Sequence, residues 1–202
     1  MLLWSDPMDM SPMSTAFSPS PVAYAIVETA IGPIGIAWSA AGIRSVALPQ
    51  RDRAAMERRF TAKLDGAAPG EPPPAVAAAI ELIKRYAEGE AVDFSSVVVD
   101  LDGVDLFRRA IYQAARRLGF GETTTYGGLA DAAGQPGKAR ETGEALGRNP
   151  VPIIVPCHRI VAAGGKIGGF SAPGGSATKE KLLAMEGVRV GPPPAAQQAF
   201  GF

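Results

Sequence analysis

The hydrophobic pattern of this chain changes at Asp105, and this change limits what each part can fold into. Before Asp105, short apolar runs separated by Gly and Pro predict strands, and two longer segments predict helices. The strands are expected at 24–28, 35–38, 43–48 and 94–101, and the helices at 53–64 and 75–88. The segment 66–74 is too rich in Pro and Gly for regular structure. This part is therefore predicted to be an α/β unit with a small β-sheet and helices.

After Asp105 the pattern is helical. Apolar residues recur at helical spacing from Phe107 to Leu118. Thr125 is a good N-cap for a short helix over 126–133, and a Gly-Gln-Pro-Gly turn then leads to a second helix over 138–148. A helix, a short turn and a helix form the pattern of a helix-turn-helix, although any helical hairpin shares it. We expect a mostly α-helical second domain with a helix-turn-helix.

These patterns predict two domains with tails. We expect a disordered tail at 1–21, an α/β support domain at 22–101, a second domain at 102–187 and a flexible tail at 188–202. The first domain shows no candidate site, so its expected role is structural support. There is no apolar stretch of membrane-spanning length and no signal-peptide pattern at the N-terminus. We therefore expect a cytoplasmic protein that works as a monomer, away from membranes.

The net charge is zero, but it is unevenly distributed. Residues 101–202 hold 12 Lys and Arg against 8 Asp and Glu, and residues 1–100 hold the reverse excess of acids. A polyanionic partner should therefore meet the second half.

The chain has one cysteine and one histidine, and they are neighbours, Cys157 and His158. Only a thiolate is a strong nucleophile, and imidazole is well suited to accept the thiol proton near neutral pH. A single cysteine excludes an internal disulfide and a Cys-rich zinc site. Taken alone, the pair could also be a buried structural cysteine beside a satisfied histidine.

The sequence around this pair resembles the O6-alkylguanine-DNA alkyltransferases, also called methylated-DNA–protein-cysteine methyltransferases. The matching elements are Gly121-Glu122, Thr125-Tyr126-Gly127, Ala139-Arg140, Asn149-Pro150, Pro156-Cys157-His158-Arg159, Gly165 to Phe170 and Lys179 to Glu186. The resemblance is strong over about residues 95–187. In the first half it extends only to length and pattern.

The resemblance implies DNA repair by direct, irreversible transfer of an alkyl group from O6-alkylguanine in duplex DNA to Cys157. His158 is implied as the base, acting through an ordered water, with Glu186 orienting its imidazole and Asn149 bracing the turn. Adjacent side chains of an extended strand point apart, so a bridging water would suit Cys157 and His158 better than direct contact. No cofactor and no metal are expected, and each molecule would react once.

Attack on O6 requires the nucleotide to leave the base stack. By resemblance, Arg140 fills the gap from the second helix of the helix-turn-helix, in the minor groove. Tyr126 contacts the 3′ phosphate and offers a proton to the departing guanine. Arg108 and Gln135 are further candidate phosphate contacts. The expected partner is therefore double-stranded DNA containing O6-alkylguanine.

The substrate pocket implied by the resemblance contains Ser171, Phe170, Ile160 and Val155. Phe170 would form a wall, and the main-chain carbonyl groups of Cys157 and Ile160 would accept from the guanine amino group. The sequence leaves open which alkyl groups are accepted and whether O4-alkylthymine is repaired.

Three features depart from the family pattern. Glu141 puts an acid beside Arg140, the segment 171–175 is longer than the shortest family versions, and an N-terminal zinc site lacks its Cys and His ligands. Two other classes stay open: a non-catalytic alkyl-lesion-binding module, which the retained Cys157 opposes, and a thiol hydrolase, whose Cys and His usually come from distant parts of a chain.

Overall fold

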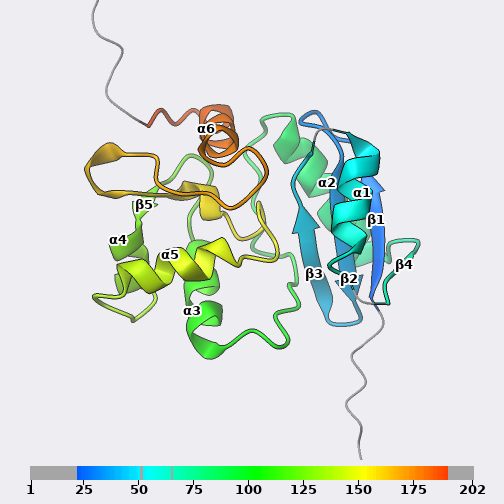
Figure 1. Cartoon of the computed structure of the whole chain (residues 1–202), viewed down its shortest axis with the longest axis horizontal. Coiled ribbons are helices and arrows are strands. Elements are labelled where there is room, and N and C mark those ends of the chain that lie inside the picture. The colour runs from blue at the N-terminus through cyan, green and yellow to red at the C-terminus, as the bar shows by residue number, and fades with distance from the viewer. Residues whose placement is uncertain (1–21, 51, 65, 191–202) are drawn as a thin grey trace, which may run out of the picture.

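The computed structural model describes residues 22–50, 52–64 and 66–190 (Figure 1). The expected tail 1–21 lies outside the described residues, as does 191–202 of the expected tail 188–202. Within the described ranges, no helix is both long enough and apolar enough to cross a membrane.

The first half forms a mixed four-stranded sheet with the order β3-β2-β1-β4. The strands are β1 (Ala23–Val27), β2 (Ile34–Ser39), β3 (Gly42–Ala47) and β4 (Ala68–Pro69). The first three pair antiparallel, which confirms the three strands expected there, whereas β4 pairs parallel to β1. The expectation of no regular structure in 66–74 was therefore wrong for these two residues: the main-chain NH of Ala68 donates to the carbonyl of Val22, and that of Gly70 donates to Tyr24.

Two helices cover the two faces of this sheet (Figure 1). They are α1 (Arg53–Thr61) and α2 (Pro74–Ala87), close to the predicted bounds. Every residue of β2 is buried, because this strand lies between both helices. Phe60 of α1 packs directly on Gly35, where a β-carbon would lie only 2.6 Å from the ring. The close approach of α1 to the sheet therefore requires glycine at this position.

The predicted strand at 94–101 is not formed. The segment makes only an isolated bridge between Val99 and Ile43 of β3. Upstream of that bridge, the Arg116 guanidinium donates hydrogen bonds to the carbonyl groups of Phe94, Ser95 and Val97. Those acceptors are thus directed to a side chain rather than to a strand ladder, and the run remains a loop.

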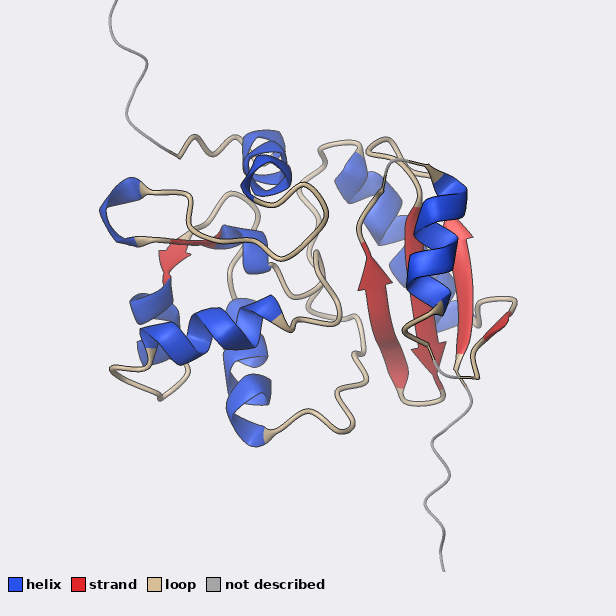
Figure 2. Ribbon diagram, in the orientation of Figure 1, coloured by secondary structure: helices blue, strands red, loops and turns tan. Residues whose placement is uncertain are grey.

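The second half is mostly helical (Figure 2). Its first three helices are α3 (Leu106–Ala115), α4 (Tyr126–Ala132) and α5 (Ala139–Gly147), which agree with the predicted segments. Thr125 is the N-cap of α4, and its hydroxyl accepts from the Gly128 NH. The three helices pack on one another, and the Tyr112 hydroxyl on α3 donates to the carbonyl of Ala145 on α5 at 2.8 Å.

The rest of the second half brings the chain back across these helices. It contains the short helices η1 (Cys157–Arg159) and η2 (Ala163–Gly165), the strand β6 (Ile160–Val161) and the final helix α6 (Ser176–Met185). Strand β6 pairs parallel to β5 (Thr124–Thr125), which places Cys157 close to the start of α4. One hydrophobic cluster runs from the α2 face of the sheet into these elements, so the two halves share a core.

Candidate active site

The turn before Cys157 is built around Asn149. Its Oδ1 accepts from the Val151 NH at 3.0 Å, and its Nδ2 donates to the Val155 carbonyl at 2.8 Å. The same Nδ2 lies 3.2 Å from the Cys157 sulfur and donates to it. Ile153 within the turn has a φ of 75°, a strained value for a β-branched residue. Asn149 therefore fixes both the path of this strained turn and the position of the sulfur.

Cys157 was expected on an extended strand, but the structure does not place it on one. It begins the short helix η1, and the segment becomes extended only at Ile160. The main-chain NH of Cys157 donates to the Val155 carbonyl, which tightens the turn. The two neighbouring side chains still diverge, because His158 is fully buried toward Glu186 while Cys157 contacts Asn149.

His158 has one ring nitrogen occupied and one free. Its Nε2 lies 2.7 Å from Oε1 of Glu186, and the Tyr86 hydroxyl donates to the same oxygen at 2.8 Å. A carboxylate can only accept, so Nε2 carries the proton. Nδ1 is buried and has no hydrogen-bond partner among the described residues. The neutral imidazole therefore holds its free lone pair on Nδ1, as a base requires.

Glu186 is held from several directions. Nε and Nη2 of Arg159 donate to its carboxylate at 2.9 to 3.2 Å, and the Gly121 NH donates to Oε2 at 3.0 Å. Nη1 of Arg159 also donates to the Leu118 carbonyl at 2.6 Å. The carboxylate and guanidinium are both buried, and their mutual hydrogen bonds compensate for the loss of water.

These surroundings set the protonation states. Burial raises the pKa of Glu186, but hydrogen bonds from His158 and Arg159 outweigh it and hold that pKa down to about 2. Burial lowers the pKa of His158, against the opposing pull of Glu186. Burial also raises the pKa of the Cys157 thiol, while Asn149 and Lys179 act to lower it. At neutral pH the site thus holds a carboxylate, a neutral imidazole and a thiol that still has its proton.

Lys179 is a buried cation on α6. Its Nζ donates to the carbonyl groups of Ile160 and Gly169, and it lies 5.7 Å from the centre of the Tyr126 ring. Burial lowers its pKa to about 8. The ammonium group thus joins α6 to the two segments on either side of the loop that follows Cys157.

A first cavity of about 500 Å³ opens beside the sulfur. It is lined by Cys157, Tyr126, Phe170 and Ser171, with Arg140 at its edge. The Tyr126 hydroxyl donates to the Gly169 carbonyl at 3.2 Å. Gly168 has a φ of 75°, and a β-carbon there would lie 3.1 Å from the Tyr126 ring and hydroxyl, so glycine lets the loop close over this side chain.

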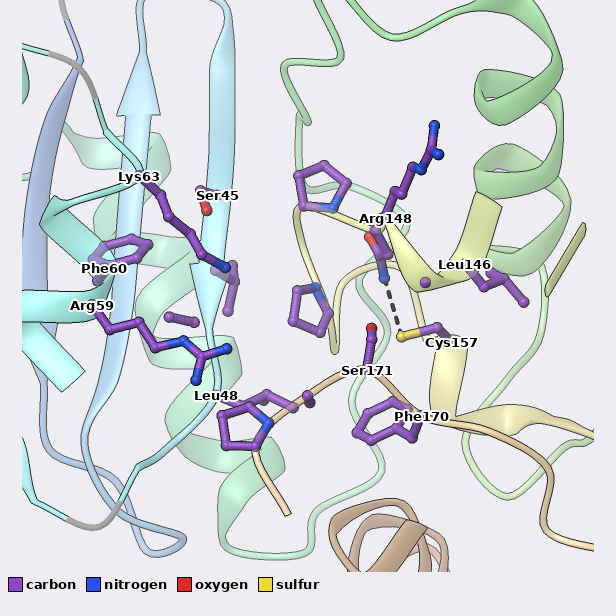
Figure 3. A pocket seen from close by; sticks show the side chains of 18 of the residues that line it. Ser45, Leu48, Arg59, Phe60, Lys63, Leu146, Arg148, Cys157, Phe170 and Ser171 are labelled. Atoms are coloured by element: carbon purple, nitrogen blue, oxygen red, sulfur yellow. Dashed lines mark hydrogen bonds between the residues drawn. The ribbon is translucent and has the colours of Figure 1, made fainter. Parts of the chain in front are cut away.

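A second cavity of about 320 Å³ reaches the same sulfur from the first half of the chain (Figure 3). One wall carries Cys157 and Ser171, and the other carries Arg59 of α1 and Lys63, in the turn that follows α1. The dashed line in Figure 3 marks the hydrogen bond to the Cys157 sulfur. The expectation that the first half contributes no site is therefore wrong: it supplies Tyr86 to the buried network and one wall of this cavity.

The remaining candidates lie on α3, on α5 and in the turn between α4 and α5. Arg140 is 90% exposed in its side chain and lies 3.4 Å from Glu144, and Glu141 is exposed on the same helix. Arg108 is paired with Asp105 at 2.6 Å. Gln135 is half-buried in the turn before α5.

Two predicted pocket residues are placed elsewhere. Val155 and Ile160 are fully buried and line neither of the two cavities. Their main-chain carbonyl groups accept hydrogen bonds from the side chains of Asn149 and Lys179 respectively. The side chains of Val155 and Ile160 therefore pack in the hydrophobic core and support the turn, rather than lining a cavity.

Three site residues had no role assigned from the sequence: Tyr86, Arg159 and Lys179. A signal existed for Tyr86, since it follows Ile80 and Ile83 at helical spacing on the buried face of α2, and a buried tyrosine needs a partner for its hydroxyl. For the two cations, no local pattern shows that a charged side chain will be buried rather than solvated.

Comparison with known proteins gives a consistent result. Residues 106–188 match the family described as 6-O-methylguanine DNA methyltransferase, DNA binding domain. The methylated-DNA–protein-cysteine methyltransferase of Mycobacterium bovis is 33% identical over 166 residues, which cover 82% of this chain and 93% of that protein. The mouse (Mus musculus) protein of the same name is 33% identical over 84% of this chain and 83% of its own length.

Among solved structures, Mycobacterium tuberculosis OGT in complex with DNA superimposes with a TM-score of 0.65 at 34% identity, covering 81% of this chain and 92% of that one. With this likeness spread over both halves, the chain belongs to the family of methylated-DNA–protein-cysteine methyltransferases.

Proposed function

We propose that this protein repairs DNA by transferring an alkyl group from O6-alkylguanine in duplex DNA to the sulfur of Cys157. The observation that carries the proposal is the arrangement of the only cysteine and the only histidine of the chain: Cys157 lines an open cavity, and the next residue, His158, has its Nε2 bonded to a buried carboxylate. The type of reaction is inferred from the membership of the chain in the methyltransferase family.

The protonation states support a sequence of steps. The thiol proton passes through a water to Nδ1 of His158, and Glu186 stabilises the imidazolium that forms. The sulfur then forms a bond to the alkyl carbon, while the bond from that carbon to O6 breaks and leaves its electron pair on guanine. Tyr126 lines the same cavity, and its hydroxyl is suited to give guanine a proton once it turns from the Gly169 carbonyl, with the thiol proton restoring the tyrosine afterwards. The thioether that forms is stable, so each molecule reacts only once.

DNA binding is assigned to the second half. We infer a helix-turn-helix formed by α4 and α5, with Arg140 on α5 filling the space of a flipped nucleotide. The pairing of these helices and the exposure of Arg140 support this role. Arg108 remains a weaker candidate for a phosphate contact, because Asp105 already holds its guanidinium. Gln135 is half-buried in the turn between the two helices, and we keep it as a candidate for a phosphate contact.

We further propose two domains, 22–101 and 102–187, with the shared hydrophobic core as their interface. The protein is proposed to act as a monomer in the cytoplasm, where a lone thiol remains reduced. Asn149 is proposed as the residue that positions the sulfur.

The decisive experiment is a mass measurement of the peptide that carries Cys157 after incubation with duplex DNA containing O6-methylguanine. We expect one added methyl group on Cys157, and no addition in the Cys157→Ser variant, which should still bind the duplex. An unmodified Cys157 peptide under conditions in which the DNA is bound would refute the transfer.

A second experiment tests Arg140. The Arg140→Ala variant should lose much more rate on duplex O6-methylguanine than on free O6-benzylguanine, because only the duplex requires nucleotide flipping. Equal losses on the two substrates would remove Arg140 from that role.

A further inference from the structure

The two cavities described above meet at the nucleophile. Five residues line both of them: Leu146, Gly147, Cys157, Phe170 and Ser171. The first cavity continues toward Tyr126 and Arg140, and the second continues toward β3 and α1. The sulfur is therefore accessible from two directions, only one of which the flipped base needs.

The geometry of the reaction gives the second direction a use. In a direct displacement, the sulfur, the reacting carbon and O6 lie in one line, so any chain on that carbon projects sideways from the line. With the base in the cavity beside Tyr126, as the proposed function has it, a substituent larger than methyl needs space next to the sulfur. The second cavity supplies that space, and its volume of about 320 Å³ lies within the range of roughly 300–1,000 Å³ found for small-molecule sites.

The walls of the second cavity indicate which substituents fit. Its lining includes the apolar residues Leu48, Pro150, Pro152 and Phe170, together with polar residues such as Asn149 and Ser171. It is also cationic: Arg59 of α1 and Lys63, in the turn that follows α1, both extend toward the cavity (Figure 3). Arg148 also lines the cavity, although its guanidinium points away from Arg59 and Lys63 (Figure 3), and the described lining contains no acidic residue.

These cations have no competing partners in the described structure. Neither Arg59 nor Lys63 makes a hydrogen bond or an ion pair with the described residues, and both are exposed. Other exposed cations of the first half are paired, namely Arg53 with Glu28 and Arg85 with Glu90, whereas Arg58 has no ion-pair partner among the described residues and does not line the cavity. Two unpaired cations in a cavity that also has apolar walls form a site for an anion carried on an apolar linker.

We propose that the second cavity holds the O6-substituent during transfer and that Arg59 and Lys63 favour substituents that end in a carboxylate. This inference rests on the proposed function and extends it to the class of alkyl group. The reaction stays balanced: the sulfur bonds to the benzylic or methylene carbon, the C–O6 bond breaks, the thiol proton ends on guanine, and the carboxylate is a spectator that lies against the cations.

The test uses free guanine bases, so that DNA contacts play no part. The full chain is incubated with O6-(4-carboxybenzyl)guanine and, separately, with O6-(4-carbamoylbenzyl)guanine, which has nearly the same shape and no charge. The rate of adduct formation on Cys157 is followed by mass spectrometry. We expect the carboxylate to react faster, and the Arg59→Gln/Lys63→Gln variant to lower the ratio of the two rates by about twofold to fivefold, within the range expected for exposed ion pairs.

The matched control is Arg58→Gln, which removes a neighbouring cation of α1 that does not line the cavity, and it should keep the ratio of the wild-type chain. Equal rates for the two bases in the wild-type chain, or a ratio that the double variant does not change, would overturn this inference. If O6-benzylguanine transfer still occurs in that case, the proposed function stands.

A third measurement separates an anionic substituent from a DNA phosphate as the partner of these cations. If the double variant leaves the ratio for the free bases unchanged but slows transfer from duplex O6-methylguanine, the cations bind the DNA backbone and the inference is wrong. If neither base nor O6-benzylguanine alkylates Cys157, it is the proposed function that fails.

Discussion

Tyr86 carries a hydroxyl group from the first half of the chain into the buried network of the second. That hydroxyl donates to Glu186 Oε1 at 2.8 Å and lies 3.1 Å from Nε2 of His158. It helps to fix the carboxylate that orients the imidazole. It does not face the cavities, so we regard Tyr86 as a positioning residue.

We predict that Tyr86→Phe lowers the rate of alkyl transfer by roughly fivefold, the equivalent of about 1 kcal/mol in the activation barrier. The variant should also lose about 1.5–3 kcal/mol of unfolding free energy, the usual contribution of a hydrogen bond to a charged group. Single-turnover kinetics and urea denaturation measure the two effects. Tyr24→Phe is the control, since Tyr24 is a buried tyrosine that packs on Phe60, away from the network. A full rate in Tyr86→Phe would leave the residue a purely structural role.

Glu186 makes stability depend on pH. Its pKa is about 2 in the folded chain against an ordinary value of 4.5. A carboxyl group whose pKa is depressed by folding stabilises the fold above its unfolded pKa, and this contribution disappears as the pH falls through the folded value. We predict that stability declines as the pH falls from about 4.5 to about 2. The buried neutral His158 acts in the same direction below its own ordinary pKa of 6.5.

The Glu186→Gln variant should be less stable at neutral pH, by an amount on the order of 3 kcal/mol, and should have a flatter stability profile between these two pH values. Thermal denaturation across the pH series measures this. Glu180→Gln, an exposed acid on α6, serves as the control. An unchanged slope in Glu186→Gln would show that other carboxyl groups cause the acid sensitivity.

At the scale of elements, α5 combines features that oppose each other. It carries Arg140, the proposed flipping residue, together with Glu141 and Glu144. Glu144 lies 3.4 Å from the Arg140 guanidinium, and both side chains are exposed. The acids add negative charge to a helix proposed to approach phosphates, so they weaken the attraction that the second half provides.

We predict that Glu144→Gln tightens binding to undamaged duplex DNA by about twofold to fourfold at low salt, and that the gain shrinks as salt screens the charges. Fluorescence anisotropy over a salt series measures the change. Glu57→Gln removes an equal charge from α1 rather than from α5 and should leave the affinity unchanged. If Glu144→Gln weakens binding, then the ion pair is needed to hold Arg140 in a competent orientation.

The elements that could be predicted from the sequence are those with a strong local pattern. The helices around Ile111 and Ala145 and the first three strands appear where their periodicity places them. The strand at 94–101 failed because its carbonyl groups bind Arg116, a partner that local sequence does not reveal. The conformation of Cys157 failed for a similar reason, since Asn149 folds the turn through contacts eight residues away.

At the scale of the whole molecule, the halves form one structure. The hydrophobic cluster that contains Trp38 of the sheet also contains Cys157 and Leu182. We predict that the halves unfold together. In a Trp4→Phe background, the urea transition seen by Trp38 fluorescence should coincide with the transition seen by labelling of the Cys157 thiol. Earlier labelling of Cys157, at lower urea, would show that the second half unfolds by itself.

The division of labour between the halves was the main feature that the sequence could not predict. Resemblance located the nucleophile, its base and the orienting acid on the second half. The contribution of Tyr86 and of the α1 wall depends on how two distant segments pack together. These contacts form only when the core is assembled, because α1 and α2 lie far in the sequence from the residues of the second half that they approach.

The resting state of the thiol has a consequence for how long the protein lasts before use. Peroxide and stray electrophiles attack sulfur mainly in its ionised form, and they need access to it. In this chain Cys157 is 8% exposed, and its thiol keeps its proton until a base removes it. A repair agent that is spent in a single event is thereby protected from being wasted in the interval before it meets damage.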